Sequence, residues 1–403
     1  ITDDIDQCAD SPSGAQVDET GCLPSPVYLD SNGVTIKSYA WGEIGQSGEV
    51  NGITYTIIDE TILRNMVITG QDVTRVCTTK VTSMNNLFAG LPFNQDIGSW
   101  DTSNVTNMES LFLQSPFNQD ISLWDVSSVT TMKEMFRLSQ FNRPIGNWDV
   151  SNVTTMRDMF SDSPFNQDIS SWNVISVKDM GHIFNVTPFN QDISSWDVSG
   201  VTNMSLMFKQ TPFNQPIGNW DVSEVVDMDA MFADSQFNQP IEKWDISNVT
   251  DLNYLFMNSP FNQPIGNWDV SNVADMSEMF QGSSFNEPIG DWDVSNVVIM
   301  KFMFTVSDFN QPIGDWDVSK VTDMSYLFSV SDFNQPIGNW DVSSVTDMSN
   351  MFSGSGLTYV FSKFNQDISS WNVISVKDMG HIFNVTPFNQ DISSWDVSGV
   401  TNM

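Results

Sequence analysis

A unit of 24 residues repeats along this chain, and that period constrains the fold more than any other feature. Each unit opens with Phe, and the first eleven of these Phe residues stand 24 apart. The step from Phe333 to Phe364 is 31, because one unit carries seven extra residues near 354–362. A fixed period of this length is typical of a solenoid, in which each unit is one coil stacked on the last. The thirteen units open at Phe93, Phe117, Phe141, Phe165, Phe189, Phe213, Phe237, Phe261, Phe285, Phe309, Phe333, Phe364 and Phe388, and the last is incomplete.

The charge of the chain speaks against nucleic acid as a partner. The sequence holds 50 acidic and 15 basic residues, a formal net charge of −35, whereas contacts to phosphate groups need a basic surface. Such a charge suits a protein in a salty or calcium-containing medium, where screening relieves self-repulsion. No apolar run approaches the roughly 18 to 20 residues that span a bilayer, so we expect no membrane insertion in this fragment. We also expect further residues before Ile1 and after Met403.

The second half of each unit predicts a short helical turn. Its apolar residues recur at spacings of 3, 3 and 1, which places them on one face of a helix. In the first unit they are Val105, Met108, Leu111 and Phe112. Thr106 before the Met, with Glu109 three residues later, is a helix start signal.

The first half of each unit, Phe-Asn-Gln-(Pro/Asp)-Ile-x-x-Trp, predicts an extended segment. Proline lacks an amide hydrogen, and the residue before it avoids the helical region. We therefore predict an α/β repeat solenoid with one short strand and one short helical turn in each coil. An α+β cap is expected at its amino end, because a first coil would otherwise expose its core.

Residues 27–92 are predicted to form this cap and a partial first repeat. Apolar runs over 34–39 and 52–58 predict short strands that could form a hairpin, and residues 59–67 predict a short helix with acidic residues in its first turn. We expect Trp41 to lie in the core of the cap. Cys77 is predicted to be a buried free thiol, with a disulfide to another chain as the alternative.

The Asn that follows each Phe predicts a ladder along the array. Stacked coils place equal side chains about 4.8 Å apart, so each Asn could bond backbone groups of a neighbouring coil. The thirteen ladder residues are Asn94, Asn118, Asn142, Asn166, Asn190, Asn214, Asn238, Asn262, Asn286, Asn310, Asn334, Asn365 and Asn389.

Trp also recurs in all thirteen units, from Trp100 to Trp395, and we interpret it as stacked core rather than as a platform for sugars. The residue after Trp is Asp in eleven units. We expect this Asp to form an Asx turn with its own backbone, and calcium bound between coils is the alternative.

Residues 1–26 are an acidic linker with too few apolar side chains to pack alone, so they need a covalent cross-link or a bound metal ion to hold a structure. Cys8 and Cys22 are well placed for a disulfide, and a bond that closes a loop of about 15 residues contributes roughly 3 kcal/mol. The linker also resembles the end of a thrombospondin type-3-like calcium repeat of bacterial secreted proteins, through Asp3, Asp6 and Cys8 and then Val-Asp and Gly-Cys. The resemblance implies calcium ligation by Asp3 and Asp6 together with upstream carboxylates, so the site in this chain is incomplete.

The repeat Phe-Asn-Gln-x-Ile-x-x-Trp-Asp-Val-Ser-Asn-Val-Thr-x-Met-Ser-x-Met-Phe resembles the BspA-like leucine-rich-repeat proteins of bacterial surfaces, over roughly residues 27–403. The resemblance implies a right-handed leucine-rich-repeat-like solenoid that is secreted or displayed on the cell surface. It also implies adhesion or binding of extracellular protein or glycan partners. It transfers no catalytic, cofactor-binding or contact residue to this chain.

Two stretches, 165–204 and 364–403, are identical over 40 positions and hold both histidines, His182 and His381. Catalysis needs an acid and a base in unlike environments, whereas the carboxylates here recur coil after coil. Neither His has a Ser or Cys nucleophile beside it in the sequence. We therefore expect no catalytic site and no required cofactor, and a polysaccharide-active solenoid enzyme remains the weak alternative.

The sequence thus predicts an extracellular adhesion or binding module, with a passive stalk or surface-layer spacer as the alternative. Recognition should lie at positions that the units do not share, such as Leu123, Lys243 and Lys301. The one local concentration of basic charge, which we interpret as scattered solubilising charge, comprises Lys133, Arg137, Arg143 and Arg157. The expected domains are the linker over 1–26, the cap over 27–92 and the array over 93–403.

Overall fold

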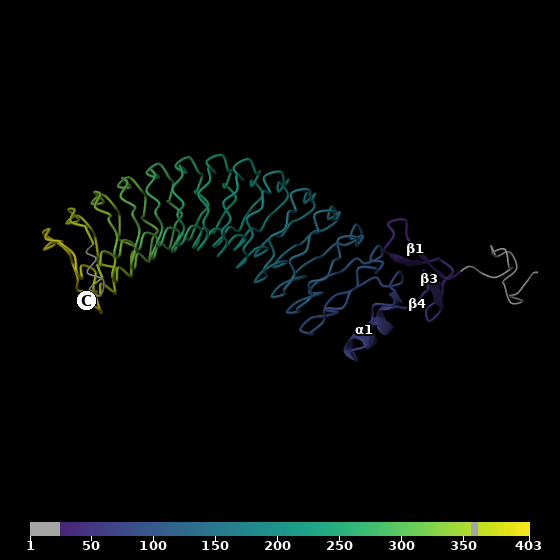
Figure 1. The fold of residues 1–403 in the computed structure, drawn as a ribbon. Coiled ribbons are helices and arrows are strands. Elements are labelled where there is room, and N and C mark those ends of the chain that lie inside the picture. Colours follow the sequence, from purple (N-terminus) through teal and green to yellow (C-terminus); the bar gives the residue numbers. More distant parts are fainter. Residues whose placement is uncertain (1–24, 356–361) are drawn as a thin grey trace, which may run out of the picture.

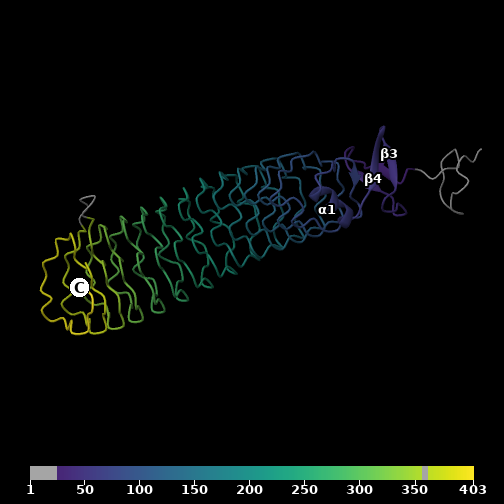
Figure 2. The same ribbon diagram turned by 90° about the horizontal axis from the view of Figure 1, so that it is seen from below.

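The computed structural model describes residues 25–355 and 362–403, and the regular secondary structure of these residues lies at the amino end. In chain order the elements are β1 (Val27–Leu29), β2 (Ile36–Ser38), β3 (Ser47–Val50), β4 (Ile53–Ile57), α1 (Glu60–Ile68) and β5 (Val76–Cys77). The following residues wind into stacked coils that form a long arc (Figure 1). Seen from below, the array is narrow and every coil follows nearly the same path as its neighbours (Figure 2).

Both predicted strand segments are present, as β2 and β4, but they do not form a hairpin with each other. β2 pairs with β1 in an antiparallel sheet, whereas β4 lies between antiparallel β3 and parallel β5. The predicted helix is α1, which begins after Asp59. The Asp59 carboxylate accepts a hydrogen bond from the Ile62 backbone N–H at 2.8 Å, and the helix buries Leu63 and Val67.

Of the two predictions of buried side chains in this region, the one for Cys77 is confirmed and the one for Trp41 is wrong. Cys77 is fully buried and free, and burial raises the pKa of its thiol, which confirms the predicted buried thiol. Trp41 is 42% exposed and stacks on Tyr39 with ring centroids 5.6 Å apart, so its predicted place in the core is wrong. The small core beneath the two sheets is filled instead by Val27, Ile36, Ile57 and Cys77.

The predicted helical turn in each coil is also wrong. In the described residues α1 is the only helix and the two small open sheets hold all the strands, so the chain is not an α/β solenoid. The segment that we expected to be helical forms consecutive β-turns. We call it the turn segment, which covers residues 276–283 in the unit that opens at Phe261 and the equivalent residues elsewhere. Its local bonds join Met279 N–H to Met276 O and Gln281 N–H to Glu278 O, a separation of three residues rather than the four of an α-helix.

Residues with positive φ explain why the apolar spacing was misleading. Glu278 has a φ of 58° and Gly282 a φ of 64°, and equivalent residues in the other coils share these values closely. A left-handed residue ends an α-helix but is required at the third position of a type II turn. The turns still leave Met276, Met279 and Phe280 buried on one side. The same apolar spacing therefore fits both conformations.

Backbone bonds between coils replace the bonds that a helix would make within a coil. Alternate N–H groups of each turn segment donate to carbonyl oxygens of the next coil. The pairs are Met276 to Ile299, Glu278 to Lys301, Phe280 to Met303 and Gly282 to Thr305, with N to O distances of 2.8–3.0 Å. Single-residue parallel bridges, such as Asp275 to Ile299, precede each turn segment. This ladder satisfies buried backbone groups without regular strands or helices.

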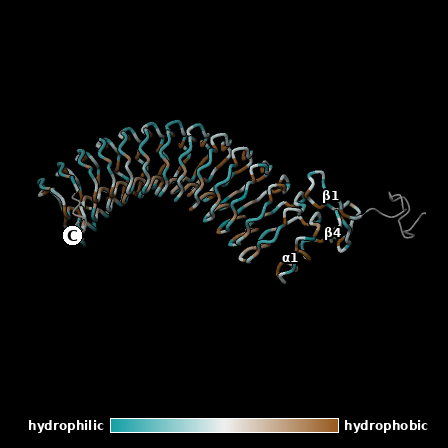
Figure 3. The backbone as a smooth tube through the Cα atoms, viewed as in Figure 1, coloured by the Kyte–Doolittle hydropathy of each residue, from teal (hydrophilic) through white to brown (hydrophobic). Residues whose placement is uncertain are grey.

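Aromatic and aliphatic side chains fill the coils as one continuous column. Phe280 lies 4.2 Å from Phe285 and 5.7 Å from Phe304, measured between ring centroids. The indole Nε1 of Trp292, which is 3% exposed, donates to the Ile265 carbonyl oxygen of the preceding coil at 3.1 Å. The predicted role of Trp as stacked core is confirmed. Figure 3 shows apolar stretches recurring at the same place from coil to coil.

The curvature of the array follows from unequal spacing on its two sides. In the turn segments, Phe304 and Phe328 have ring centroids 5.8 Å apart, whereas Trp316 and Trp340 of the same coils are 6.5 Å apart. Backbone bonds hold the turn segments together, while stacked indoles separate the coils at the Trp side. A stack bends toward the side where its layers are closer. The turn segments therefore line the inner side of the arc in Figure 1.

The left-handed positions predict opposite effects for two valines. Val306 is 54% exposed with a φ of 54°, a conformation that a β-branched residue adopts at a cost of about 1–2 kcal/mol. Val306→Gly should therefore raise the free energy of unfolding by about 0.5–1 kcal/mol. Val298 is also exposed but has no positive φ, so Val298→Gly should lower it by about 1 kcal/mol. Urea unfolding of both variants measures the difference, and equal signs would contradict the assigned backbone.

Candidate functional site

The sequence-predicted metal and disulfide residues, Asp3, Asp6, Cys8 and Cys22, lie outside the described residues. Among residues 25–355 and 362–403, no group of three or more His, Cys, Asp or Glu side chains is arranged to hold a metal ion. In the same part of the chain, no helix combines the length and the apolar character that crossing a membrane requires.

The ladder asparagines are engaged in bonds between coils. Each Oδ1 accepts the backbone N–H of the Asn in the next coil, with distances of 2.9–3.1 Å from Asn94 through to Asn389. The Gln that follows adds a side-chain bond, as from Gln263 Nε2 to Asn238 Oδ1 at 3.0 Å. These side-chain bonds join each coil to the next along the whole ladder.

The Asp after each Trp forms the predicted Asx turn. Asp317 Oδ1 accepts the Ser319 backbone N–H at 3.1 Å, and the same bond recurs at Asp269. Bonds from the Ser319 side chain and backbone hold the pKa of Asp317 below its usual range. Turn amides thus stabilise these charges along the stack.

Residue identity varies most on one surface of the array. We define the inner surface as the side chains equivalent to Ser277, Glu278, Gln281 and Gly282 in each coil. The positions equivalent to Glu278 have the same left-handed backbone, yet they carry nine residue types. They are Ser110, Glu134, Asp158, His182, Leu206, Ala230, Tyr254, Glu278, Phe302, Tyr326, Asn350 and His381. Phe280 and its equivalents beneath this surface are Phe in every unit.

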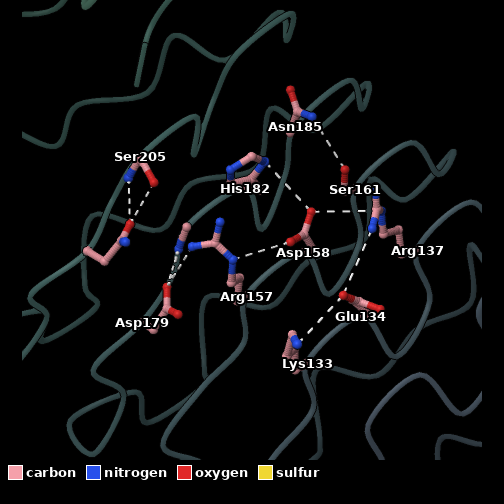
Figure 4. Close-up of polar contacts among 12 residues, drawn as sticks. Lys133, Glu134, Arg137, Arg157, Asp158, Ser161, Asp179, His182, Asn185 and Ser205 are labelled. Carbon is pink, nitrogen blue, oxygen red and sulfur yellow. Dashed lines mark hydrogen bonds and ion pairs between the residues drawn. The ribbon is translucent and has the colours of Figure 1, made fainter. Parts of the chain in front are cut away.

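A charged cluster occupies the amino-terminal part of the inner surface (Figure 4). It comprises Lys133, Glu134, Arg137, Arg157, Asp158, Asp179 and His182. Asp158 is 7% exposed and lies at the centre, 3.9 Å from Arg137 Nε, 3.6 Å from Arg157 Nε and 3.7 Å from His182 Nδ1. Burial raises the pKa of Asp158 and lowers the pKa of His182.

The structure sorts the predicted basic residues into two groups. Lys133, Arg137 and Arg157 come together because they lie in turn segments of adjacent coils. Arg143 lies in an extended segment, where its Nε donates to the Asn118 carbonyl oxygen at 2.9 Å. Lys133 and Arg157 are 24 residues apart, so the repeat period alone predicts that they lie in equivalent places of adjacent coils. The contact between Arg137 and Asp158 depends on the geometry of the turns.

The two identical 40-residue stretches have different surroundings on this surface. His182 follows a coil with Arg157 and Asp158, whereas His381 follows one with Ser349 and Asn350 at the equivalent places. His182 is half-buried and His381 is exposed. The duplicated sequence therefore does not produce a duplicated site.

Two further features lie on the inner surface beyond the charged cluster. Phe302 and Tyr326 stack with ring centroids 4.4 Å apart and both remain partly exposed. Asp229 lies among other carboxylates, and its buried Oδ1 has no hydrogen-bond partner. Burial, followed by the charges of Asp251 and Asp227, raises the pKa of Asp229 to about 6.

Asp229 should make stability fall as the pH rises. A carboxyl group with a higher pKa in the folded than in the unfolded state binds its proton more tightly when folded, so stability is lost between about pH 4 and about pH 6. Asp229→Asn should match the parent at pH 4 and exceed its free energy of unfolding by about 1–2 kcal/mol at pH 8, after allowance for partial exposure. Chemical unfolding at both pH values measures this.

Asp221→Asn is the matched control. Bonds from the Ser223 side chain and backbone lower the pKa of Asp221, so its contribution is present above the unfolded pKa and is lost as the pH falls through the lower folded value. This variant should be less stable than the parent at pH 8. A gain at pH 8 for both variants would show that general self-repulsion, rather than the burial of Asp229, sets the effect.

A family model described as "Mycoplasma protein of unknown function, DUF285" matches residues 59–164, 116–212, 138–238, 185–284, 233–332, 255–361 and 305–403. No curated protein matches the chain.

Proposed function

The chain belongs to the family described as a Mycoplasma protein of unknown function, DUF285, and from that premise we propose that it is a non-enzymatic binding module of the cell exterior. Its partners are extracellular proteins or glycans, and it contacts them with the inner surface. The family model repeats along the array, which makes this a repeat protein. The likeness of its repeat to BspA-like leucine-rich-repeat proteins supports surface display or secretion.

One observation carries the proposal: residue identity varies on the inner surface while the buried positions stay constant. The side chains equivalent to Glu278 range from Asp158 and His182 to Leu206 and Phe302 on one regular backbone. The stability of the stack does not require different side chains at these exposed positions. An extended surface with a different side chain in each coil is suited to a large partner.

The state of the carboxylates supports a non-enzymatic role. Asp269 and its equivalents bond their own turns, and Asp158 is paired with basic side chains. Acid and base catalysis needs two groups whose environments are set apart around a substrate. The one His–Asp pair, His182 with Asp158, lies within the charged cluster, and no hydroxyl or thiol group hydrogen-bonds to it in the described residues.

Exchange of surface residues tests the proposal. The inner-surface variant replaces Glu134, Tyr254, Glu278, Phe302 and Tyr326 by Asn, which tolerates a positive φ as Asn350 does. The control variant replaces Leu123, Asn147, Asn219 and Asn267 on the Trp side by Ser, the residue found there at Ser171. Both are compared with the parent on a glycan array and on immobilised extracellular proteins. Saturable binding that only the inner-surface variant loses is expected.

The alternative function is a passive stalk or spacer, which the ladder of backbone bonds between coils favours. A stalk would show no saturable partner at micromolar concentration. Equal binding by the parent and the inner-surface variant would place recognition elsewhere on the chain. Either result would overturn the proposal.

A further inference from the structure

We propose that an apolar patch on the inner surface binds a peptide segment of a partner protein in which an apolar side chain stands next to Lys or Arg. The patch comprises Phe302, Val306, Tyr326 and Val330. The apolar side chain of the peptide contacts the patch, and the basic residue contacts carboxylates that flank it. This inference rests on the proposed function, since it assigns a ligand class to one part of the inner surface.

The first argument is that two adjacent coils expose apolar side chains at equivalent places. Phe302 stacks on Tyr326 with ring centroids 4.4 Å apart and an angle of 8° between the ring planes. Val306, which is 54% exposed, and Val330 each lie four residues further along the same coils. In both coils the residue before the valine is small and buried, so no exposed polar side chain separates the rings from the valines. An exposed apolar patch with polar surroundings is typical of a protein interaction site.

The second argument is that the stability of the fold does not account for the patch. Its four residues have φ values of 54–59°, a conformation that is costly for bulky and β-branched side chains, and their exposure limits what burial can offset. The coil of Phe302 also carries Ile299 at the bridging position, where the other described coils carry Asp, Asn, Ser or Thr. Binding of a partner gives a reason for apolar side chains at these places.

The third argument concerns the charges around the patch. Four carboxylates flank it in its own coils and in the two adjacent coils: Asp275, Glu278, Asp323 and Asp347. In the part of the chain that the structure describes, none of them belongs to an ion pair, whereas Asp158 in the charged cluster lies within 3.9 Å of Arg137 and Arg157. One cation, Lys301, lies in the same coils. The excess of unpaired carboxylates makes this surface complementary to a basic partner.

The fourth argument selects a peptide over a glycan. Phe302 and Tyr326 cover one ring face of each other, and the two valines offer neither a flat face nor a hydrogen-bonding group to a sugar. The surface instead requires an apolar group and a cation close together. An apolar side chain next to Lys or Arg supplies both, and this combination is typical of polypeptides.

Selection from a phage library of short random peptides, with the full chain as bait, tests the inference. We expect enriched peptides to carry Leu, Ile, Phe or Trp next to Lys or Arg. The best peptide is then synthesised, and its Kd is measured by fluorescence anisotropy. Phe302→Asn with Tyr326→Asn should weaken binding by roughly tenfold or more, and Asn tolerates the positive φ as Asn350 does. Leu206→Asn, at the equivalent place outside the patch, is the matched control and should change the Kd less than about twofold.

Val306→Gly separates a loss of binding from a loss of folding. Glycine adopts a positive φ without strain, so this variant should be more stable than the parent and yet bind the peptide about threefold more weakly. Val186→Gly is its matched control, since Val186 is 41% exposed with a φ of 55° at the equivalent place of another coil. It should gain similar stability and leave the Kd unchanged. Equal weakening by both glycines would overturn the patch.

Neutral substitutions test the role of the carboxylates. Asp275→Asn with Asp323→Asn should weaken binding about threefold or more and reduce its dependence on salt. Asn preserves the local turn, because Asn203 at the equivalent place accepts the following turn N–H through Oδ1 at 2.9 Å. Asp227→Asn with Asp378→Asn changes the net charge equally away from the patch and should have less than about a twofold effect. Equal weakening by both pairs would show general attraction and overturn the assigned contacts.

The remaining outcomes distinguish this inference from the proposed function. Enriched peptides that bind the Phe302→Asn, Tyr326→Asn variant as well as the parent would overturn the patch and leave a binding module intact. Cellohexaose, a neutral oligosaccharide, would overturn the peptide assignment if it bound the parent and not this variant. Selection that enriches no peptide with adjacent apolar and basic residues would overturn the inference, while the surface-exchange experiment would still decide the proposed function.

Discussion

Phe208→Ala is expected to lower the free energy of unfolding by about 3–5 kcal/mol, because it removes a fully buried ring from the middle of the column. Phe208 lies at the meeting point of four other rings. Their centroids are 3.9 Å away for Phe213, 5.8 Å for Phe232, 5.9 Å for Phe184 and 6.4 Å for Trp220. No single neighbour can fill the space that the ring leaves.

The loss should also divide the array into two cooperative units. Each coil contacts only its neighbours, so a weakened interface uncouples the coils on its two sides. Guanidinium unfolding followed by tryptophan fluorescence should show two transitions where the parent shows one. Phe302→Ala is the matched control, since Phe302 is partly exposed and, in the part of the chain that the structure describes, stacks only on Tyr326. This variant should cost about 1 kcal/mol or less. Similar losses for both variants would contradict the assigned core.

Glu278→Pro should be at least as damaging through the backbone. Glu278 has a φ of 58°, which the proline ring cannot adopt, and its N–H donates to the Lys301 carbonyl oxygen at 3.0 Å. The substitution therefore strains one turn and leaves a carbonyl group of the next coil unpaired. We expect a loss of about 3 kcal/mol or more, measured by urea unfolding.

Asp192→Pro is the control for this substitution. Seven units carry proline at the equivalent place, and no backbone bond is donated by Asp192 in the described residues. The change removes only the bond from Ser194 N–H to Asp192 Oδ1, so it should cost about 1 kcal/mol or less. A large loss here and a small loss at Glu278 would reverse our assignment of extended and turn segments.

The column could be predicted from the sequence because burial depends on side-chain type and period. Phe, Ile, Trp, Val and Met recur at fixed places, and stacking identical coils buries such residues together. The bonding pattern of the backbone could not be predicted in the same way. Glycine is the usual sequence sign of a left-handed backbone, and Gly282 fits that rule. Glu278 and Val306 have the same left-handed backbone although they are not glycine, so the sequence gives no sign of it there.

The charged cluster is a second feature that could not be predicted fully from the sequence, because its contacts depend on the backbone of the turns. In the sequence, four basic residues appear as one group because they are near one another in the chain: Lys133, Arg137, Arg143 and Arg157. The structure separates Arg143 and adds His182, because turn segments of neighbouring coils meet while extended segments face another side. Arg137 and Asp158 are 21 residues apart, and they meet because of the conformation of the turns. The spacing of apolar residues does not predict that conformation.

The ladder between turn segments gives the array an electrical polarity. Met276, Glu278, Phe280 and Gly282 all point their N–H groups toward the following coil, so these four peptide dipoles add along the stack as they do in an α-helix. The carboxyl-terminal end of the ladder is then its positive pole. The ladder thus acts as one long dipole, whose field is felt most at the two ends of the stack: it favours anionic groups beside the last coils and cations beside the first.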